Sequence, residues 1–239
     1  MRIAVSAGHN VYNGKHFDCG SVGNGKRECD ITKETVKLLI PMLKAQGHTV
    51  LDVTPYNERF VNAKAHHKLR CERADKFNAD LYIDVHVNAG GGTGVETWVY
   101  SKGSKAYPYA DKICKSISKN VGIANRGVKI NPEYWSVSLC KAPAIIAEGA
   151  FIDTKSDMDK LTPEKYARSI AECFGEVKKA EKKEKKLDKI KVNLHGKQLE
   201  VEGIYKDNTN YIPVRFLESL GYKIDWKNGT VVVDYKEGK

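Results

Sequence analysis

The chain has 239 residues, which is enough for one domain of ordinary size and a small second one. Its composition, 41% hydrophobic and 29% charged residues, lies in the range of globular proteins. No run of about 18 apolar residues occurs, so the sequence excludes a transmembrane helix, and we expect no membrane partner.

The first residues, MRIAVSAGHN, do not resemble a secretory signal. Such a signal needs an apolar stretch of roughly 7–15 residues and a cleavage site. We therefore expect the protein to be made in the cytoplasm.

The net charge of +10 favours a polyanionic partner. Nucleic acid, an anionic membrane face and a cell wall that carries teichoic acid would all satisfy it. No helix-turn-helix, zinc-finger or RNA-binding signature accompanies the charge, and aromatic residues are not interleaved with the basic ones. A nucleic-acid partner is therefore disfavoured.

Six cysteines occur, and none of them forms a C-x-x-C pair, which argues against a thiolate zinc site. Three of them lie in apolar or helix-like surroundings, where a free cysteine packs as a small hydrophobic residue. We predict reduced cysteines, although an even count also permits disulfides. The six are Cys19, Cys29, Cys71, Cys114, Cys140 and Cys173.

In chain order, apolar runs alternate with amphipathic stretches. Strands are predicted at residues 2–7, 49–53, 81–87, 94–100, 136–140 and 144–147. Helices are predicted at residues 30–45, with Pro41 inside, and at 57–77, 107–121 and 163–177, the last with Thr162 as its N-cap.

Alternating strands and helices predict an α/β fold: a mostly parallel, twisted sheet with helices on both faces. Functional groups in such sheets gather where the strands end. His9, His86 and Glu148 each lie at or just beyond the end of a predicted strand. We therefore expect these three side chains to meet.

The composition changes after the predicted catalytic domain, residues 1–175. Residues 176–186, EVKKAEKKEKK, have no apolar face and read as a charged linker. Residues 187–239 predict a small α+β domain, with strands at 189–194 and 231–235, a short helix at 214–220 and a hairpin turn at Asn228-Gly229.

Hydrolytic zinc sites take three ligands from His, Glu or Asp and leave one position for water. The metal lowers the pKa of that water, and a nearby carboxylate accepts its proton. His9, His86, Glu28 and Glu148 could supply these parts. Taken alone, His9 also reads as a surface-loop histidine, His86 as a core histidine and Glu28 as a carboxylate favoured by the helix dipole. Glu148, at the mouth of a buried strand, needs a partner, and a metal-bound water is one.

The order and surroundings of these residues resemble the zinc amidases of the N-acetylmuramoyl-L-alanine amidase family labelled amidase-3. The matching segments are AGHN, RECDITKETVKLL, LRCERADKFNADLYIDVHVNAG, Gly94-Val95-Glu96, Arg126-Gly127-Val128-Lys129 and AEGAFIDTKSDMDKL, all within residues 1–175. The resemblance implies Zn²⁺ as cofactor, with His9, Glu28 and His86 as its ligands and Glu148 as the catalytic carboxylate.

Other candidates are weaker. His66 and His67 lie in a charged helix and are interpreted as solvated, and Glu96 is expected to be exposed rather than to contact substrate. The GGGTG run at residues 90–94 lacks the Lys-Ser/Thr of a phosphate loop and is interpreted as space for substrate beside His86.

The C-terminal segment, with YIPVRFLESLGYKIDWKNGTVVVDY, resembles the small stalk-type domain found beside copper amine oxidases and on bacterial wall proteins. It offers one histidine, His195, and no cysteine, so a copper site is not expected. A wall-binding role is implied only by that resemblance.

The resemblance implies a peptidoglycan amidase that cuts between N-acetylmuramic acid and L-alanine. Without a secretory signal, it looks like a phage endolysin that reaches the wall of the host after the membrane is opened. A bacterial autolysin or spore-cortex amidase is the nearest alternative, and a non-catalytic wall-binding protein is the alternative from another class. Anionic wall polymers are possible partners of the basic surface, and the oligomeric state is not predicted.

Overall fold

The computed structural model describes residues 1–177, 188–194, 197–206, 209–211, 217–218, 220–227 and 230–235. The chain forms two compact units, Met1–Lys178 and Lys179–Lys239. Most of the predicted linker, residues 178–186, lies outside the described residues. None of the described helices is long and apolar enough to cross a membrane.

The first unit is built on a six-stranded sheet, whose order is β10-β9-β11-β8-β1-β6. Its strands are β1 (Arg2–Ala7), β6 (Thr49–Asp52), β8 (Leu81–Asn88), β9 (Val95–Val99), β10 (Asn125–Ile130) and β11 (Ala144–Phe151). Neighbouring strands are parallel except for β9 and β11, which run antiparallel. The predicted mostly parallel α/β sheet is confirmed.

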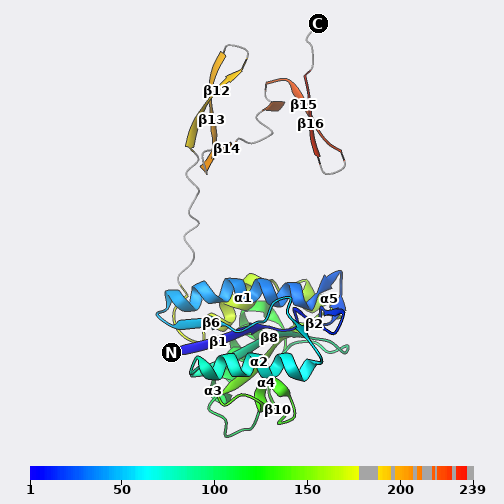
Figure 1. The fold of residues 1–239 in the computed structure, drawn as a ribbon, viewed down its shortest axis with the longest axis vertical. Coiled ribbons are helices and arrows are strands. Elements are labelled where there is room, and N and C mark those ends of the chain that lie inside the picture. The colour runs from blue at the N-terminus through cyan, green and yellow to red at the C-terminus, as the bar shows by residue number, and fades with distance from the viewer. Residues whose placement is uncertain are drawn as a thin grey trace. The chain divides into compact units, whose positions relative to one another are not determined.

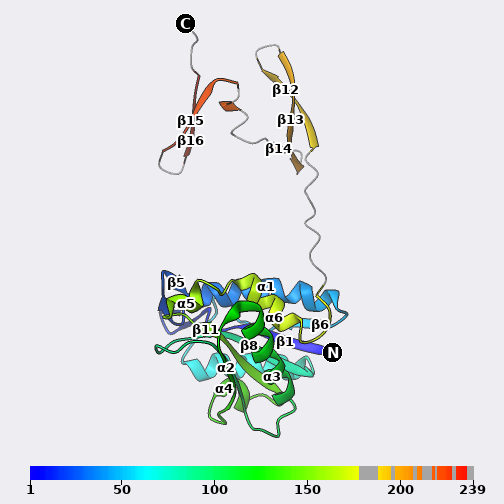
Figure 2. The same ribbon diagram turned by 180° about the vertical axis from the view of Figure 1, so that it is seen from behind.

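Helices cover both faces of this sheet (Figures 1 and 2). The helices α1 (Glu28–Ala45), α3 (Tyr107–Ile117) and α6 (Pro163–Ala171) share one apolar core, and α2 (Ala63–Lys76) and α4 (Trp135–Ser138) share the other. Alternation along β1 divides its side chains between the two cores: Ile3 and Val5 face the first, whereas Ala4 faces the second.

The first unit also contains shorter elements. They are β2 (Val11–Asn13), β3 (His16–Asp18), β4 (Val22–Gly23), β5 (Lys26–Arg27), β7 (Arg59–Phe60), the π-helical turn η1 (Ser118–Gly122) and α5 (Lys155–Met158). The β2–β3 hairpin and the β4–β5 hairpin occupy the chain between β1 and α1. The residues that precede α1 are thereby folded back beside the end of β1.

Several element boundaries differ from the prediction. Residues 136–140 do not form a strand, because residues 135–138 close a short helix with backbone bonds from Ser138 to Tyr134 and from Leu139 to Trp135. The helix predicted from residue 57 begins at Ala63, since Asn57 has φ of 61° and Asn62 accepts a capping bond from the backbone of Ala65. The N-cap role of Thr162 is confirmed.

The prediction that all cysteines are reduced is wrong for one pair. Cys71 on α2 and Cys140, just beyond α4, form a disulfide, since these elements pack together and bring the two Cα atoms to 4.7 Å. Cys19, Cys29, Cys114 and Cys173 are free, as predicted.

The second unit contains two described antiparallel arrangements. The strands β12 (Asp188–Leu194), β13 (Lys197–Lys206) and β14 (Thr209–Tyr211) form one sheet, and β15 (Tyr222–Lys227) pairs with β16 (Thr230–Tyr235) in another. The predicted Asn228-Gly229 turn, His195 and most of the predicted helix at 214–220 lie outside the described residues.

Candidate metal centre and catalytic pocket

The parallel strands β1, β8 and β11 lie side by side and bring the predicted residues to one edge of the sheet. Ala7 pairs with Val85, and His86 pairs with Glu148 across β8 and β11. The strand β11 does not end at Glu148, as the sequence suggested, but continues to Phe151 with an irregular register. Glu148 therefore lies within β11, three residues before the strand ends.

His9 is aimed by an unusual backbone turn directly after β1. His9 and Asn10 both have left-handed conformations, with φ of 60° and 64°. The buried Asn10 amide donates to the carbonyls of Gly8 and Cys29 and stabilises the turn. A second anchor is the buried Arg70, whose Nη2 donates to the carbonyl of His9 at 2.6 Å. This turn directs the His9 ring toward α1.

Glu28 is the first residue of α1, and its side chain points between the two histidines. Its Oε2 lies 3.2 Å from Nε2 of His9, and its Oε1 lies 3.0 Å from Nδ1 of His86. The backbone amides of Ser21 and Val87 also donate to this carboxylate. Burial alone would raise the pKa of Glu28, but the hydrogen bonds from both histidines outweigh it and hold the pKa well below its usual range.

Two glycines leave the space in which these side chains meet. A Cβ built on Gly8 would lie 2.5 Å from the His86 ring, and one on Gly20 would lie 2.5 Å from the His9 ring and 2.6 Å from Oε2 of Glu28. Any larger residue at either position would displace a member of the cluster.

Each histidine is also held by an aspartate that the sequence analysis did not single out. Oδ1 of Asp18 lies 2.7 Å from Nδ1 of His9, and Oδ2 of Asp84 lies 3.3 Å from Nε2 of His86. A carboxylate on the outer nitrogen fixes the tautomer of a histidine and leaves the inner nitrogen free to bind a metal. The inner nitrogens here are the two that face Glu28.

One ligand atom from each of His9, Glu28 and His86 lies within 4.8 Å of the others. Two imidazoles, one carboxylate and supporting aspartates form the donor set of a catalytic zinc ion with an open position. The residues present therefore fit zinc, and the structure brings together the three ligands that the resemblance implied.

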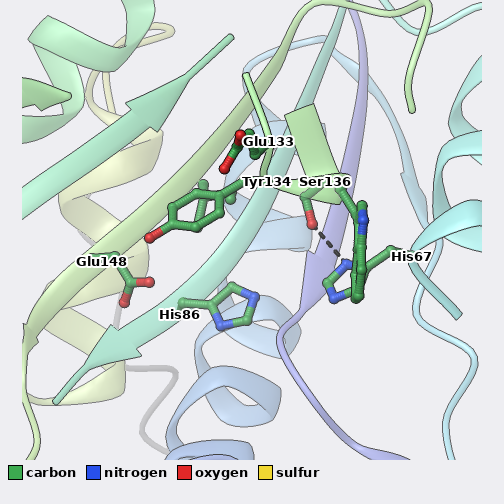
Figure 3. A pocket seen from close by; sticks show the side chains of 8 residues that line it. His67, His86, Glu133, Tyr134, Ser136 and Glu148 are labelled. Carbon is green, nitrogen blue, oxygen red and sulfur yellow. Dashed lines mark hydrogen bonds between the residues drawn. The ribbon is translucent and has the colours of Figure 1, made fainter. Parts of the chain in front are cut away.

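Glu148 lies beside this cluster in a pocket of about 330 Å³ (Figure 3). His86 and Glu148 line one part of the pocket, and His67, Glu133, Tyr134, Trp135, Ser136 and Ile146 line the rest. Burial raises the pKa of Glu148 to about 7. Its Oε2 is buried and has no hydrogen-bond partner among the described residues. A carboxyl group in this state can exchange a proton with a molecule bound in the pocket.

Two interpretations of side chains near the site are corrected. Glu96 is only 4% exposed, because it accepts hydrogen bonds from Asn88 and Arg126, each at 2.7 Å. His66 is buried at 2% exposure, and the half-buried His67 lines the pocket, with burial lowering their pKa values to about 4 and about 3. The burial of these two histidines could not be predicted from the charged sequence of α2, because the buried face of this helix is itself polar and includes Arg70.

Comparison with known proteins identifies a family that matches this chain. The family described as N-acetylmuramoyl-L-alanine amidase matches residues 3–177. An uncharacterised protein of Clostridium perfringens is 32% identical over 184 residues, which cover 74% of this chain and 52% of that protein. The endolysin of Bacillus phage SPP1 is 31% identical over 182 residues, covering 73% of this chain and 63% of the endolysin.

A solved structure agrees with these sequence matches. The catalytic domain of the CD27L endolysin, targeting Clostridia Difficile, superposes with a TM-score of 0.65 at 27% identity, covering 73% of this chain and 96% of that domain. The chain thus matches an isolated catalytic domain almost end to end, whereas it spans about half the length of the Clostridium perfringens relative.

Proposed function

The chain belongs to the N-acetylmuramoyl-L-alanine amidase family, and we propose that it hydrolyses the amide bond between N-acetylmuramic acid and L-alanine in peptidoglycan, with zinc as cofactor. One observation carries this proposal. Ligand atoms of His9, Glu28 and His86 lie within 4.8 Å of one another, and Glu148, which shares a pocket with His86, has a buried carboxyl oxygen with no hydrogen-bond partner among the described residues.

His9, Glu28 and His86 would hold the zinc ion. When bound, zinc acts as a Lewis acid that polarises a carbonyl group and makes water acidic enough to attack at neutral pH. Asp18 and Asp84 keep the outer nitrogens of the two histidines engaged, so that the inner nitrogens remain directed at the metal position.

Glu148 acts as the general base and then as the general acid. Its Oε2 takes a proton from the water that attacks the lactyl carbonyl, and the carboxyl group returns the proton to the leaving nitrogen of L-alanine. The raised pKa, about 7, suits a group that must both accept and release a proton near neutral pH.

The experiment that tests the amidase proposal is digestion of purified bacterial cell walls. We expect new amino termini of L-alanine, no new reducing sugar ends, and loss of activity when a chelator removes zinc. Reducing ends without free L-alanine would contradict the bond assignment. A protein that binds walls but never turns over would favour the non-catalytic alternative.

We further propose that the protein is a phage endolysin, made in the host cytoplasm and acting on the wall after the membrane is opened. Its similarity to two endolysins supports this role. We propose that the second unit, Lys179–Lys239, binds the wall, and that the net charge of +10 favours anionic wall polymers.

Expression inside a susceptible bacterium tests the endolysin role. An endolysin leaves the cells intact until an agent permeabilises the membrane, and lysis then follows at once. Lysis without permeabilisation would instead indicate an exported autolysin.

A further inference from the structure

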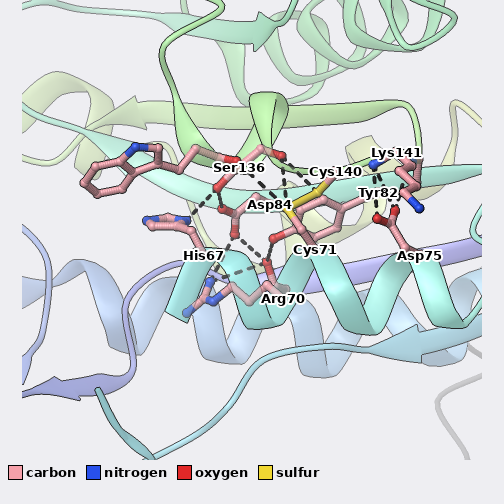
Figure 4. Close-up of a disulfide and its surroundings, with 12 residues drawn as sticks. His67, Arg70, Cys71, Asp75, Tyr82, Asp84, Ser136, Cys140 and Lys141 are labelled. Atoms are coloured by element: carbon pink, nitrogen blue, oxygen red, sulfur yellow. Dashed lines mark hydrogen bonds and ion pairs between the residues drawn. A yellow bond between two sulfur atoms is a disulfide. The ribbon is translucent and has the colours of Figure 1, made fainter. Parts of the chain in front are cut away.

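Hydrogen bonds connect His67 in the pocket wall through Ser136 to Asp84 (Figure 4), and Asp84 forms an ion pair with the proposed zinc ligand His86. Nδ1 of His67, on α2, lies 2.8 Å from Oγ of Ser136, on α4. That hydroxyl lies 2.6 Å from Oδ2 of Asp84, on β8, and the same carboxylate oxygen contacts Nε2 of His86. Ser136 is 2% exposed and Asp84 is fully buried, so these contacts lie in the interior of the protein.

The surroundings of Asp84 determine where the protons of these hydrogen bonds are. The carboxylate is ion-paired with the fully buried Arg70 and also accepts from the hydroxyl of Ser6. All of its neighbours are donors, so the single hydroxyl proton of Ser136 is directed at Asp84.

This arrangement fixes the tautomer of His67. Because the proton of Ser136 is committed to Asp84, the Ser136 oxygen can only accept from His67, and Nδ1 of His67 must carry a proton. In the neutral ring, Nε2 then holds a lone pair. No residue between 1 and 177 offers a hydrogen bond to this nitrogen, although His67 lines the pocket with His86 and Glu148 (Figure 3).

We propose that Nε2 of His67 accepts a hydrogen bond from a donor group of the substrate, which makes His67 a specificity-determining residue of this site. The inference rests on the proposed amidase function. It commits to a neutral N–H or O–H donor. The substrate carries such donors on the stem peptide, as amide N–H groups, and on the muramoyl sugar, as its hydroxyls and its acetamido N–H.

The position of the His67 ring is set from several sides. The ring contacts His66 with centroids 4.3 Å apart and Trp135 with centroids 5.9 Å apart, while Ser136 holds its Nδ1. Four residues further along the chain from His67 and from Ser136, Cys71 and Cys140 form the disulfide. An acceptor on so restricted a ring loses little rotamer freedom when substrate binds.

The tautomer can be tested without any enzymatic activity. Nitrogen NMR of the histidine-labelled full chain, loaded with zinc, should show His67 neutral, with a protonated Nδ1 and an unprotonated Nε2. In Ser136→Ala this preference should be lost while the zinc content stays unchanged. A His67 that carries its proton on Nε2 in the unaltered protein would overturn the proposal.

The role in specificity is tested by kinetics on N-acetylmuramoyl-L-alanyl-D-isoglutamine. His67→Phe keeps a flat ring but removes the acceptor, so we expect KM to rise about tenfold with kcat and zinc content nearly unchanged. His67→Gln, which offers an amide oxygen, should recover part of the loss. His16→Phe, at an exposed position on β3, is the matched control.

Substrate analogues identify the donor. One analogue carries an N-methylated peptide bond, one carries an N-methylated acetamido group, and others have single sugar hydroxyls replaced by hydrogen. The analogue that lacks the relevant donor should bind the unaltered enzyme about tenfold more weakly and lose nothing further in His67→Phe. If every analogue weakens binding to His67→Phe as much as it weakens binding to the unaltered enzyme, the proposal is wrong. An unchanged KM in a folded His67→Phe variant would also overturn it. If the unaltered protein does not cleave the substrate at all, the amidase proposal fails instead, and the NMR result still stands by itself.

Discussion

Asp18 accepts a hydrogen bond from His9 on the nitrogen that faces away from Glu28, at 2.7 Å. Asp18 ends β3, and the pairing of β3 with β2 places it beside the turn that carries His9. The role of Asp18 is therefore to orient a ligand.

We predict that Asp18→Asn weakens zinc binding about 10- to 100-fold, since the amide is a poorer acceptor and can present its NH₂ group instead. Competition with a zinc-binding dye measures the affinity. Asp159→Asn, on an exposed residue after α5, should bind zinc normally. An unchanged affinity in Asp18→Asn would show that the turn alone positions His9.

The ligand assignment is tested by removing the imidazoles. His9→Ala and His86→Ala should each lose the zinc ion, because two ligands are too few for a stable catalytic site. Metal analysis of the purified proteins gives the stoichiometry, which should be one zinc per chain in the unaltered protein. His16→Ala, at an exposed position, should retain the metal. Full zinc content in both ligand variants would contradict the assignment.

Glu148→Gln separates metal binding from catalysis. The variant should fold and hold zinc but lose at least about 10²-fold in kcat, since the amide cannot accept the proton of water. Release of L-alanine from soluble muramoyl peptides measures the rate. Glu164→Gln, in the first turn of α6, is the matched control. If kcat survives in Glu148→Gln, the proton acceptor is another group, and Glu96 is the next residue to test.

Gly20 and Gly14 provide a matched pair for testing the packing of the metal centre. Both have left-handed backbones, with φ of 67° and 62°, so an alanine strains both positions similarly. Only at Gly20 would the new Cβ collide with His9 and Glu28, whereas nothing lies within 4 Å of a Cβ at Gly14. Gly20→Ala should therefore weaken zinc binding far more than Gly14→Ala does. Isothermal titration calorimetry with zinc measures both affinities. Equal effects would mean that backbone strain, and not the collision, dominates.

Removal of the second unit tests whether the first unit alone carries catalysis and the second unit carries wall binding. Every proposed ligand and the complete sheet lie within Met1–Lys178. A chain that ends near Lys178 should fold, hold zinc and cleave soluble muramoyl peptides at close to the full rate. On intact cells it should be slower, because a wall-binding unit raises the local concentration of the active site. An insoluble or metal-free product would show that the second unit completes the fold, and equal activity on cells would remove its anchoring role.

The sequence predicted the parts of the site that follow local rules. His9, His86 and Glu148 could be located because the apolar runs of parallel strands end toward the same edge of the sheet. The strand β11 itself continues to Phe151, beyond the end that the sequence suggested. Glu28 was found through a resemblance to a known family, since its position at a helix start has an ordinary explanation in the helix dipole.

The residues that were missed depend on contacts between distant parts of the chain. Asp84 lies in an apolar strand, and its partners Ser6 and Ser136 are 78 and 52 residues away. The four-residue helix α4 is too short to show a helical period, so its residues were predicted as a strand. His67 was assigned to solvent because no apolar stripe on α2 revealed which face is buried.

The disulfide between Cys71 and Cys140 closes a loop across a sequence separation of 69 residues. This loop contains the ligand His86 together with β8, β9, α3 and β10, whereas His9, Glu28 and Glu148 lie outside it. In the chain-entropy description, a ring of this size restricts the denatured ensemble by about 4 kcal/mol. The central segment of the chain would thus remain covalently closed after heat or denaturant has separated the ligands. On return to native conditions, the two open arms would have to fold back onto a ring that already holds one histidine of the metal centre.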